Sequence, residues 1–370
     1  MNRRDVLLST GAFALASVAA RAATPPDVSP AAHALYERSL VFDANMFPPP
    51  SDAATYPQKL IDMVRASGVT AVKSSLGGSD ENFEDTIAEI AGFQQFVEDR
   101  PDVFMQIRVA SDFAKAKAEK RFGILFSFES TNMFDGKIDR IELFRGLGVR
   151  VMQLSYNTTS PWAVGVMANP DTGLTAEGHK AIAAMNKQGV ALDLSHASPA
   201  TTTAAIAASA KPVLITHAGC AAIHKHPRNK TDEQLRAVAD KGGVVGIYVL
   251  PYLTASPKQP TLDDYMAHMT HALKICGEDH VGMGSDSALS PFDISSAGMA
   301  AFQKDEDYRH KTGVAAPEED RPMYVEGMNT PRRAEVVADA LLKRGYSESM
   351  AEKVLGANFV DALTTIWAPS

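Results

Sequence analysis

Short apolar runs alternate with amphipathic stretches along most of the chain. Apolar runs bounded by turn residues are typical of buried strands, and apolar positions three and four residues apart predict helices. The predicted strands are Leu40–Asn45, Val69–Ser74, Phe104–Val109, Gly123–Phe128, Arg150–Tyr156, Val190–Ser195, Pro212–Thr216, Gly243–Leu250 and His280–Gly284. The predicted helices are Tyr56–Ala66, Glu81–Val97, Thr175–Lys187, Pro199–Ala208, Asp232–Asp240, Leu262–Ile275, Thr330–Leu342 and Ser347–Thr364.

This alternation predicts βαβ units, a parallel sheet and the α/β class. A (β/α)8 TIM barrel with extra C-terminal helices fits the order of elements, although nine strand candidates leave one outside the barrel or wrongly assigned. A doubly wound open sheet is the alternative, and it is weakened because no glycine-rich phosphate loop follows the first strand. Pro48–Pro50 and Ser290–Pro317 are expected to be loops.

The first residues have the three parts of an export signal. Arg3 and Arg4 form the charged start, Leu7–Ala20 is the apolar run, and Ala20-Arg21-Ala22 is a cleavage site of the A-x-A kind. The run is short for a membrane span, which needs about 20 apolar residues. The arginine pair favours the twin-arginine type over an ordinary secretory signal. We therefore expect a signal peptide over residues 1–22, a single barrel domain over residues 23–370, and export to the periplasm.

Composition and charge exclude several classes of protein. The 370 residues are 45% hydrophobic and 22% charged, values typical of globular proteins. The net charge of −8 and the lack of basic blocks argue against a nucleic-acid partner. Two cysteines cannot form a disulfide scaffold or a thiolate zinc site. A metal site would therefore use nitrogen and oxygen ligands.

Polar side chains close six of the predicted strands. They are Asn45, Glu129, Tyr156, His196, His217 and Asp286. In a parallel barrel the active site lies at the carboxyl ends of the strands. A single histidine at such a place is more often a structural residue, but two histidines with two carboxylates are harder to explain in that way. Neutral imidazoles and carboxylates suit zinc or a similar divalent metal, and one carboxylate can bridge two ions.

The segment after His217 holds further polar residues. Arg228 could bind a substrate carboxylate in a two-pronged contact, or it could be a solvated loop arginine. His224 and His226 could be ligands, but loop histidines beside a proline are usually surface residues. Cys220 is expected to be a small buried residue.

Together these residues resemble the membrane (renal) dipeptidase family of zinc peptidases, from about Ser39 to Trp367. The matching stretches are Phe128-Glu129, Gly148-Val149-Arg150 through Tyr156-Asn157, Leu174-Thr175 with Gly178, Met185-Asn186 through Asp193-Leu194-Ser195-His196, Thr216-His217-Ala218, His226-Pro227-Arg228-Asn229, His280-Val281-Gly282-Met283-Gly284-Ser285-Asp286 and Leu355-Gly356-Ala357-Asn358-Phe359. The resemblance implies a distorted (β/α)8 TIM barrel that holds two zinc ions.

The resemblance also implies a role for each site residue. Glu129 would be the carboxylate that bridges the two ions. His196 and His217 would bind one zinc, and Asp286 would serve the other zinc and proton transfer. Arg228 would hold the substrate carboxylate.

Four positions depart from the family pattern. The family's first strand ends in Asp-Gly-His-Asn-Asp, whose histidine and second aspartate bind the first zinc, but here Asn45 and Phe47 replace these two ligands. Tyr156 stands where the family has a histidine that steadies the developing oxyanion, and its hydroxyl could still donate a hydrogen bond. Leu250 replaces a tyrosine of the substrate pocket. The site of Glu129, His196 and His217 keeps the three ligands of an open catalytic zinc site.

These features predict an exported, zinc-dependent, dipeptidase-like hydrolase. Metal-activated water would attack the carbonyl of a dipeptide or similar small amide that has a free carboxylate. The missing ligands predict one zinc per chain, against two in the family. The alternative is a metal-depleted homologue with a different reaction or a ligand-binding role. We expect a small dipeptide-like substrate, no nucleic-acid partner and no stable membrane span, and a homodimer stays open.

Overall fold

The computed structural model describes residues 27–47, 57–78, 81–313 and 315–368. The predicted signal peptide and the Pro48–Pro50 segment lie outside these ranges. Nine parallel strands alternate with helices in the described residues, as predicted: β1 (Phe42–Asp43), β2 (Ala71–Leu76), β3 (Phe104–Gln106), β4 (Phe122–Phe128), β5 (Val151–Met152), β6 (Ala191–Leu192), β7 (Leu214–Ala218), β8 (Val244–Ile247) and β9 (Val281–Met283).

Eight of these strands follow one another around a closed barrel. One sheet runs in the order β1-β2-β4-β5-β6, and a second runs β7-β8-β9. Single parallel bridges join the two sheets at both seams, between Asp193 and Leu214 and between Met46 and Ser287. Strand β3 pairs only with β4 and lies off this path, so it is the ninth strand that the barrel leaves out. The barrel expectation is therefore confirmed, and the open doubly wound sheet is excluded.

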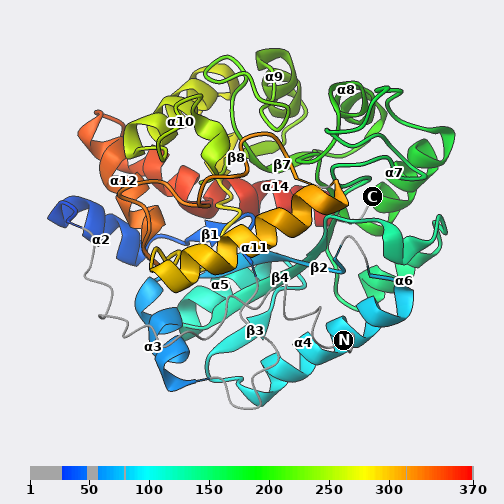
Figure 1. The fold of residues 1–370 in the computed structure, drawn as a ribbon. Helices are drawn as coiled ribbons and strands as arrows, with labels where there is room; N and C mark the ends of the chain where they lie inside the picture. Colours follow the sequence, from blue (N-terminus) through cyan, green and yellow to red (C-terminus); the bar gives the residue numbers. More distant parts are fainter. Residues whose placement is uncertain (1–26, 48–56, 79–80, 314, 369–370) are drawn as a thin grey trace.

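Helices surround the strands on all sides of the view in Figure 1. They are α2 (Pro30–Arg38), α3 (Gln58–Ser67), α4 (Phe83–Asp99), α5 (Ser111–Glu119), α6 (Arg140–Gly146), α7 (Ala176–Gln188), α8 (Pro199–Ala208), α9 (Asp232–Asp240), α10 (Leu262–Cys276), α11 (Ser296–Thr312), α12 (Arg333–Lys343), α13 (Glu348–Glu352) and α14 (Asn358–Trp367). The pattern missed α2, α5 and α6, which are short. In the part of the chain described, no helix is long and apolar enough to cross a membrane.

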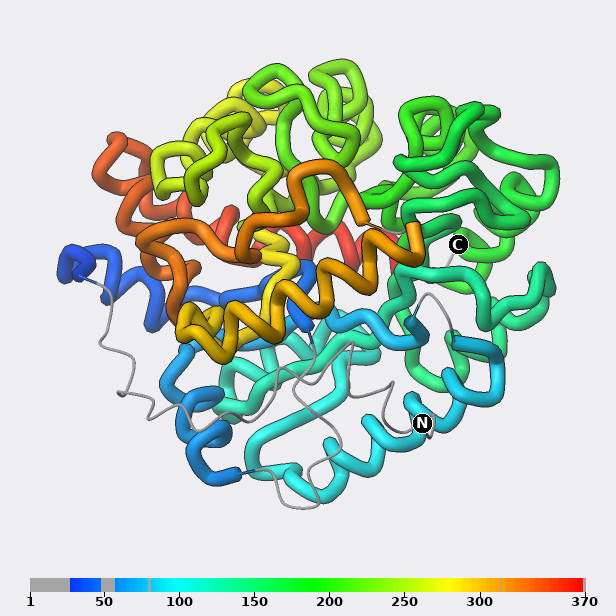
Figure 2. Tube along the Cα trace, in the orientation of Figure 1, coloured from blue at the N-terminus to red at the C-terminus, as the bar shows by residue number. Residues whose placement is uncertain are grey.

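The expectation of a loop over Ser290–Pro317 is wrong, because most of this segment forms α11. Ser295 caps its first turn, and Gly313 ends it in a left-handed conformation with φ of 74°. Its described side chains are mostly exposed, and the buried ones are few, among them Phe302. Hydrophobic periodicity cannot reveal a helix that presents so little apolar surface to the core. In Figures 1 and 2, α11 crosses in front of the barrel strands.

The end of the chain packs back on its beginning. Figure 2 shows the blue α2 beside the orange α12, and the Ser29 amide donates to Asp339 at 2.9 Å. Between α13 and α14 the turn Lys353–Ala357 (η3) passes so close to β1 that a Cβ on Gly356 would lie 2.7 Å from the backbone of Phe42. The Asn358 side chain donates to the carbonyl of Val281 in β9 at 2.8 Å. The C-terminal tail therefore supports β1 and β9, two strands that carry site residues.

Two glycines allow the strands that hold the site to approach closely. A Cβ on Gly246 would lie 2.1 Å from the Thr216 carbonyl oxygen, and one on Gly284 would lie 1.8 Å from it. No larger residue fits at either place without moving backbone. Thr216 directly precedes His217, so these contacts set the depth of that histidine in the barrel.

Candidate metal centre

Polar residues from the carboxyl ends of the strands gather at one end of the barrel. Asn45 follows β1, Glu129 follows β4, Tyr156 follows β5, His196 follows β6, His217 lies in β7 and Asp286 follows β9. This placement is the one expected for a parallel barrel, whose strand ends build its active site.

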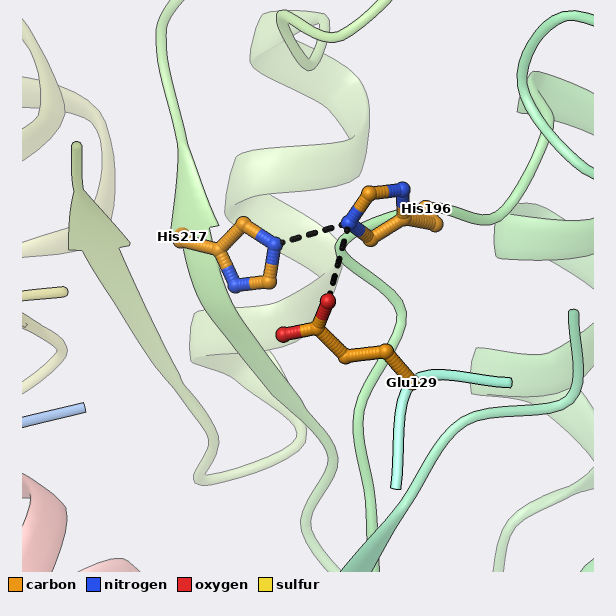
Figure 3. A group of neighbouring side chains, drawn as sticks. All are labelled: Glu129, His196 and His217. Atoms are coloured by element: carbon orange, nitrogen blue, oxygen red, sulfur yellow. Dashed lines mark hydrogen bonds and ion pairs between the residues drawn. The ribbon is translucent and has the colours of Figure 1, made fainter. Parts of the chain in front are cut away.

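Glu129, His196 and His217 point their polar atoms at one another (Figure 3). The two Nε2 atoms are 3.0 Å apart, and Nε2 of His196 is 3.7 Å from Oε2 of Glu129. One ligand atom from each residue lies within 4.8 Å of the others. Both rings are almost fully buried. The three side chains therefore form one compact group of two nitrogens and a carboxylate oxygen.

Hydrogen bonds hold both imidazole rings with Nε2 toward this group. Nδ1 of His217 donates to the Thr216 hydroxyl at 2.9 Å, and that hydroxyl donates to Oδ2 of Asp193 at 2.6 Å. Nδ1 of His196 lies 2.7 Å from the amide oxygen of Asn157. Such partners on the second nitrogen select the tautomer in which Nε2 carries a lone pair, as in protein metal sites.

Electrostatics also favour the ligand form of the histidines. Burial lowers the pKa of His196 and of His217 well below the usual value, and the nearby Arg228 guanidinium lowers it further. A neutral imidazole is the form that binds a metal.

The donor set fits a divalent metal. Oε2 of Glu129 faces His196, while Oε1 is buried without a hydrogen-bond partner and lies 3.6 Å from the Lys73 ammonium. Zinc–nitrogen bonds of about 2.0–2.1 Å in tetrahedral geometry place two ligand atoms roughly 3.3 Å apart, close to the spacing of the two Nε2 atoms. Two histidines and one carboxylate with an open position are ligands typical of catalytic zinc.

Asn45 and Phe47, which replace the two ligands of the family's first zinc, are in a different arrangement. Nδ2 of Asn45 donates to Oδ1 of Asp286 at 2.7 Å, and Oδ1 of Asn45 accepts from the Lys73 ammonium at 2.5 Å. Phe47 is 40% exposed. Sequence reasoning missed Lys73, whose only signal is a charged residue inside the apolar run Ala71–Leu76.

Asp286 is in an unusual conformation and environment. Its φ is 54°, in the left-handed region that most residues avoid. Burial and the neighbouring Glu129 carboxylate raise the pKa of its carboxyl to about 7. A carboxyl with a pKa near neutrality can take up and return a proton at physiological pH.

Arg228 is buried at the edge of the metal group, so the solvated-loop interpretation is wrong. The residue is 3% exposed, and Nη1 lies 3.1 Å from Nδ1 and 3.2 Å from Nε2 of His196. Nε and Nη2 are buried without a partner. These two atoms form one side of the planar guanidinium and match the two oxygens of a carboxylate.

The remaining predicted residues lie around this centre. The Tyr156 ring stacks on His196 with centroids 4.2 Å apart, and burial raises the pKa of its hydroxyl. Tyr156 also hydrogen-bonds to Arg309 of α11. Leu250 is buried in the hydrophobic core at the start of a short turn, Pro251–Leu253. Its part in a substrate pocket stays a prediction.

His226, expected at the surface, is instead 4% exposed and stacks on Tyr252 with centroids 4.3 Å apart. Its Nε2 bonds the Pro317 carbonyl, so it ties loops together. His224 lies beside Glu318 at 3.1 Å. Cys220 is buried as expected, and both it and Cys276 are free thiols.

The chain is similar to several known proteins. The family described as membrane dipeptidase (peptidase family M19) matches residues 51–299. An uncharacterized dipeptidase of Schizosaccharomyces pombe is 31% identical over 172 residues, a match that spans 45% of this chain and 41% of that protein. The chain therefore spans less than half of this curated relative.

Solved structures match nearly the whole chain. An amidohydrolase from Pseudomonas aeruginosa is 30% identical, with a TM-score of 0.79 over 91% of this chain and 99% of the other. A metallopeptidase from Rhodobacter sphaeroides, solved with a phosphinate mimic of the dipeptide L-Ala-D-Ala, is 18% identical, with a TM-score of 0.71 over 89% of this chain and all of the other. At 18% identity, the likeness to the Rhodobacter structure shows a shared fold.

Proposed function

The chain belongs to the membrane dipeptidase family, and from this premise we propose that it is a zinc-dependent dipeptidase with one metal ion per chain. Its substrates would be dipeptides or similar small amides with a free carboxylate. The observation that carries the proposal is the pairing of two unsatisfied features, a buried group of metal ligands and the buried, unpartnered edge of Arg228.

The metal would be held by Glu129, His196 and His217. A bound zinc ion in such a site acts as a Lewis acid and lowers the pKa of a coordinated water to about 7. The choice of zinc is supported by the nitrogen and oxygen donors and by the open fourth position. Metal analysis of the purified protein tests it.

The other residues would bind the substrate and move the proton. Nε and Nη2 of Arg228 would receive the substrate carboxylate, which orients the amide relative to the histidines. Asp286, whose Oδ1 is held by Asn45, would take a proton from the attacking water with Oδ2 and pass it to the leaving amine. The hydroxyl of Tyr156 stays protonated and would donate a hydrogen bond to the developing oxyanion.

The dipeptide class of substrate is supported by the family and by the phosphinate dipeptide mimic that the Rhodobacter relative binds. The direct experiment is a panel of dipeptides, each assayed as the free acid and as the C-terminal amide. We expect zinc-dependent hydrolysis of some free acids and much slower hydrolysis of their amides. Hydrolysis of neither form, by folded protein that holds zinc, would reject the proposal.

A binding role is the second candidate, and the replacement of two family ligands by Asn45 and Phe47 favours it. Calorimetry with the same dipeptides separates the two. A binding protein would show heat of binding with no turnover, whereas a dipeptidase would show release of free amino acids.

Export to the periplasm is part of the proposal and is supported by the pattern of residues 1–22. Changing Arg3 and Arg4 together to lysine separates the two signal types. The variant would remain in the cytoplasm if the twin-arginine route is used, and it would still be exported through an ordinary secretory signal.

A further inference from the structure

A lysine lies buried in the polar centre of the barrel. Lys73 is in the middle of β2 and is 1% exposed. Its Nζ lies 2.5 Å from Oδ1 of Asn45, 3.6 Å from Oε1 of Glu129 and 3.7 Å from Oδ2 of Asp193. A buried ammonium needs charged and polar partners, and all those described belong to other strands of the barrel.

The nearest partners of Lys73 are site residues. The amide oxygen of Asn45 accepts a hydrogen bond from Lys73, and its amide nitrogen donates one to Asp286. The Asn45 side chain therefore bridges the ammonium and that carboxylate. On the other side, Lys73 faces Oε1 of Glu129, the buried oxygen without a hydrogen-bond partner. The ammonium therefore contacts Asn45 and faces Glu129, and Asn45 connects it to Asp286.

The alternative is a structural ion pair that serves Asp193 alone. Asp193 does not need it, because its oxygens already accept hydrogen bonds from Ser195, Thr216 and Gln153. The hydrogen bond of Lys73 goes to Asn45, and its distances to Glu129 and Asp193 are nearly equal. The geometry favours a role toward Asn45 and Glu129.

We propose that the Lys73 ammonium is the second cation of this centre, fixed in the place where a second metal ion would have to bind. Asn45 stands where a ligand of that metal is expected, and Glu129 is the carboxylate that would bridge to it. A divalent ion cannot share this space with an ammonium, because the two repel each other and compete for the same oxygens. The chain is therefore limited to one metal by Lys73 as well as by its missing ligands.

This inference rests on the metal part of the proposed function, but its test is separate. It predicts how many metal ions bind, whereas the proposed function is judged by turnover of dipeptides. A chain that binds one zinc and cleaves nothing would retain this inference and lose the proposed function.

The experiment counts zinc by mass spectrometry after incubation with excess zinc and desalting. The unchanged protein should hold about one ion per chain. The double change Asn45→His and Phe47→Asp, which supplies the two missing ligands, should still hold one ion while Lys73 is present. Adding Lys73→Met to that pair should raise the count to two. The control adds Lys211→Met to the same pair, because the Lys211 ammonium donates to backbone carbonyls of the C-terminal tail and not to site residues. The zinc count of this control should stay at one.

Two results would overturn the proposal. One is a second zinc in the double variant that keeps Lys73, and the other is a single zinc in the folded triple variant. If the triple variant does not fold, Lys73→Gln is added to the double change in place of Lys73→Met. Titration of this metal-free variant with zinc should show a second binding event that the double variant lacks, and the absence of that event would also overturn the proposal.

Discussion

At the scale of single residues, each histidine of the centre depends on a partner that holds its other nitrogen. His217 is held through Thr216 and Asp193, and His196 lies against Asn157. These partners keep both Nε2 atoms turned toward the group that they form with Glu129. The burial that lowers the pKa of both rings keeps them neutral, so the protein does not need to remove a proton before a metal binds.

Replacing His217 by alanine should abolish tight metal binding, because an open site with three protein ligands then keeps only two. Zinc content per chain, measured after dialysis, should fall from about one to near zero. His280→Ala is the matched control, since that ring bonds a backbone carbonyl of Gly243 away from the centre. A His217 variant that keeps its full zinc content would show that the ligand set is wrong.

Replacing Arg228 by alanine should weaken the binding of ligands that carry a free carboxylate. A charge-assisted hydrogen bond contributes about 1.5–3 kcal/mol, so affinity should drop roughly ten- to a hundredfold. Calorimetry with a nonhydrolysed dipeptide mimic and with its C-terminal amide measures this directly. The loss should be confined to the acid, and equal losses for both ligands would contradict a carboxylate contact.

Much of the site could be predicted at this scale, but not all of it. Glu129, His196, His217 and Asp286 stand at strand ends, where a polar residue interrupts a clear pattern. Lys73 could not be found in this way, because it lies within a strand and its partners come from β1, β4 and the segment after β6. Only the closed barrel brings them together.

At the scale of elements, a half-buried glutamate on helix α4 should make the stability of the fold depend on pH. Oε2 of Glu89 in α4 accepts from the Gly77 amide after β2 at 2.6 Å. Burial and the neighbouring Glu81 carboxylate raise the pKa of Glu89 to about 7. An unfolded chain has an ordinary glutamate with a pKa of about 4.3, so between these values the folded chain holds a proton that the unfolded chain releases. Stability is therefore lost as pH rises through this window.

Glu89→Gln should remove this loss because glutamine stays neutral. The free energy of unfolding of the variant, relative to that of the unchanged protein, should rise between pH 5 and pH 8. Urea denaturation at both values measures the difference. Glu84→Gln, an exposed change on the same helix, should show no such trend. A Glu89 effect that does not vary with pH would contradict the raised pKa.

An ion pair joins Arg309 of helix α11 to Glu319 in the segment that follows the helix, and the Glu319 carboxylate is 1% exposed. Removing one partner of a buried pair costs about 3–5 kcal/mol, because the other charge stays buried. Arg309→Met should lower the free energy of unfolding by about that amount in chemical denaturation. Arg344→Met breaks an exposed pair with Asp263 and should cost less than about 1 kcal/mol. Similar costs for the two variants would mean that α11 is not anchored in this way.

Element prediction succeeded where a helix has a clear apolar stripe in its sequence and failed where the stripe is short or absent. Helices α8 and α9 begin and end where the periodicity predicts. The mostly exposed α11 and the short α2, α5 and α6 have too little apolar pattern to be recognised. All nine strands were placed correctly, and six of them are shorter than predicted: β1, β3, β5, β6, β8 and β9.

At the scale of the whole molecule, the alternation of strands and helices is enough to predict a parallel barrel, but not how it closes. Closure depends on single bridges such as Met46 to Ser287, which join residues far apart in the sequence. It also depends on the tail, where Gly356 lets the chain pass beside β1. These contacts bring Asn45 against Asp286 and so decide the character of the metal centre.

The central claim is a one-metal dipeptidase, and a zinc titration of its activity tests it most directly. Metal-free protein receives measured equivalents of zinc, and the initial rate of hydrolysis of the best dipeptide is recorded at each point. We expect a rate that rises linearly to one equivalent per chain and then stays constant. A rate that keeps rising to two equivalents, or no hydrolysis of any dipeptide at any equivalent, would contradict it.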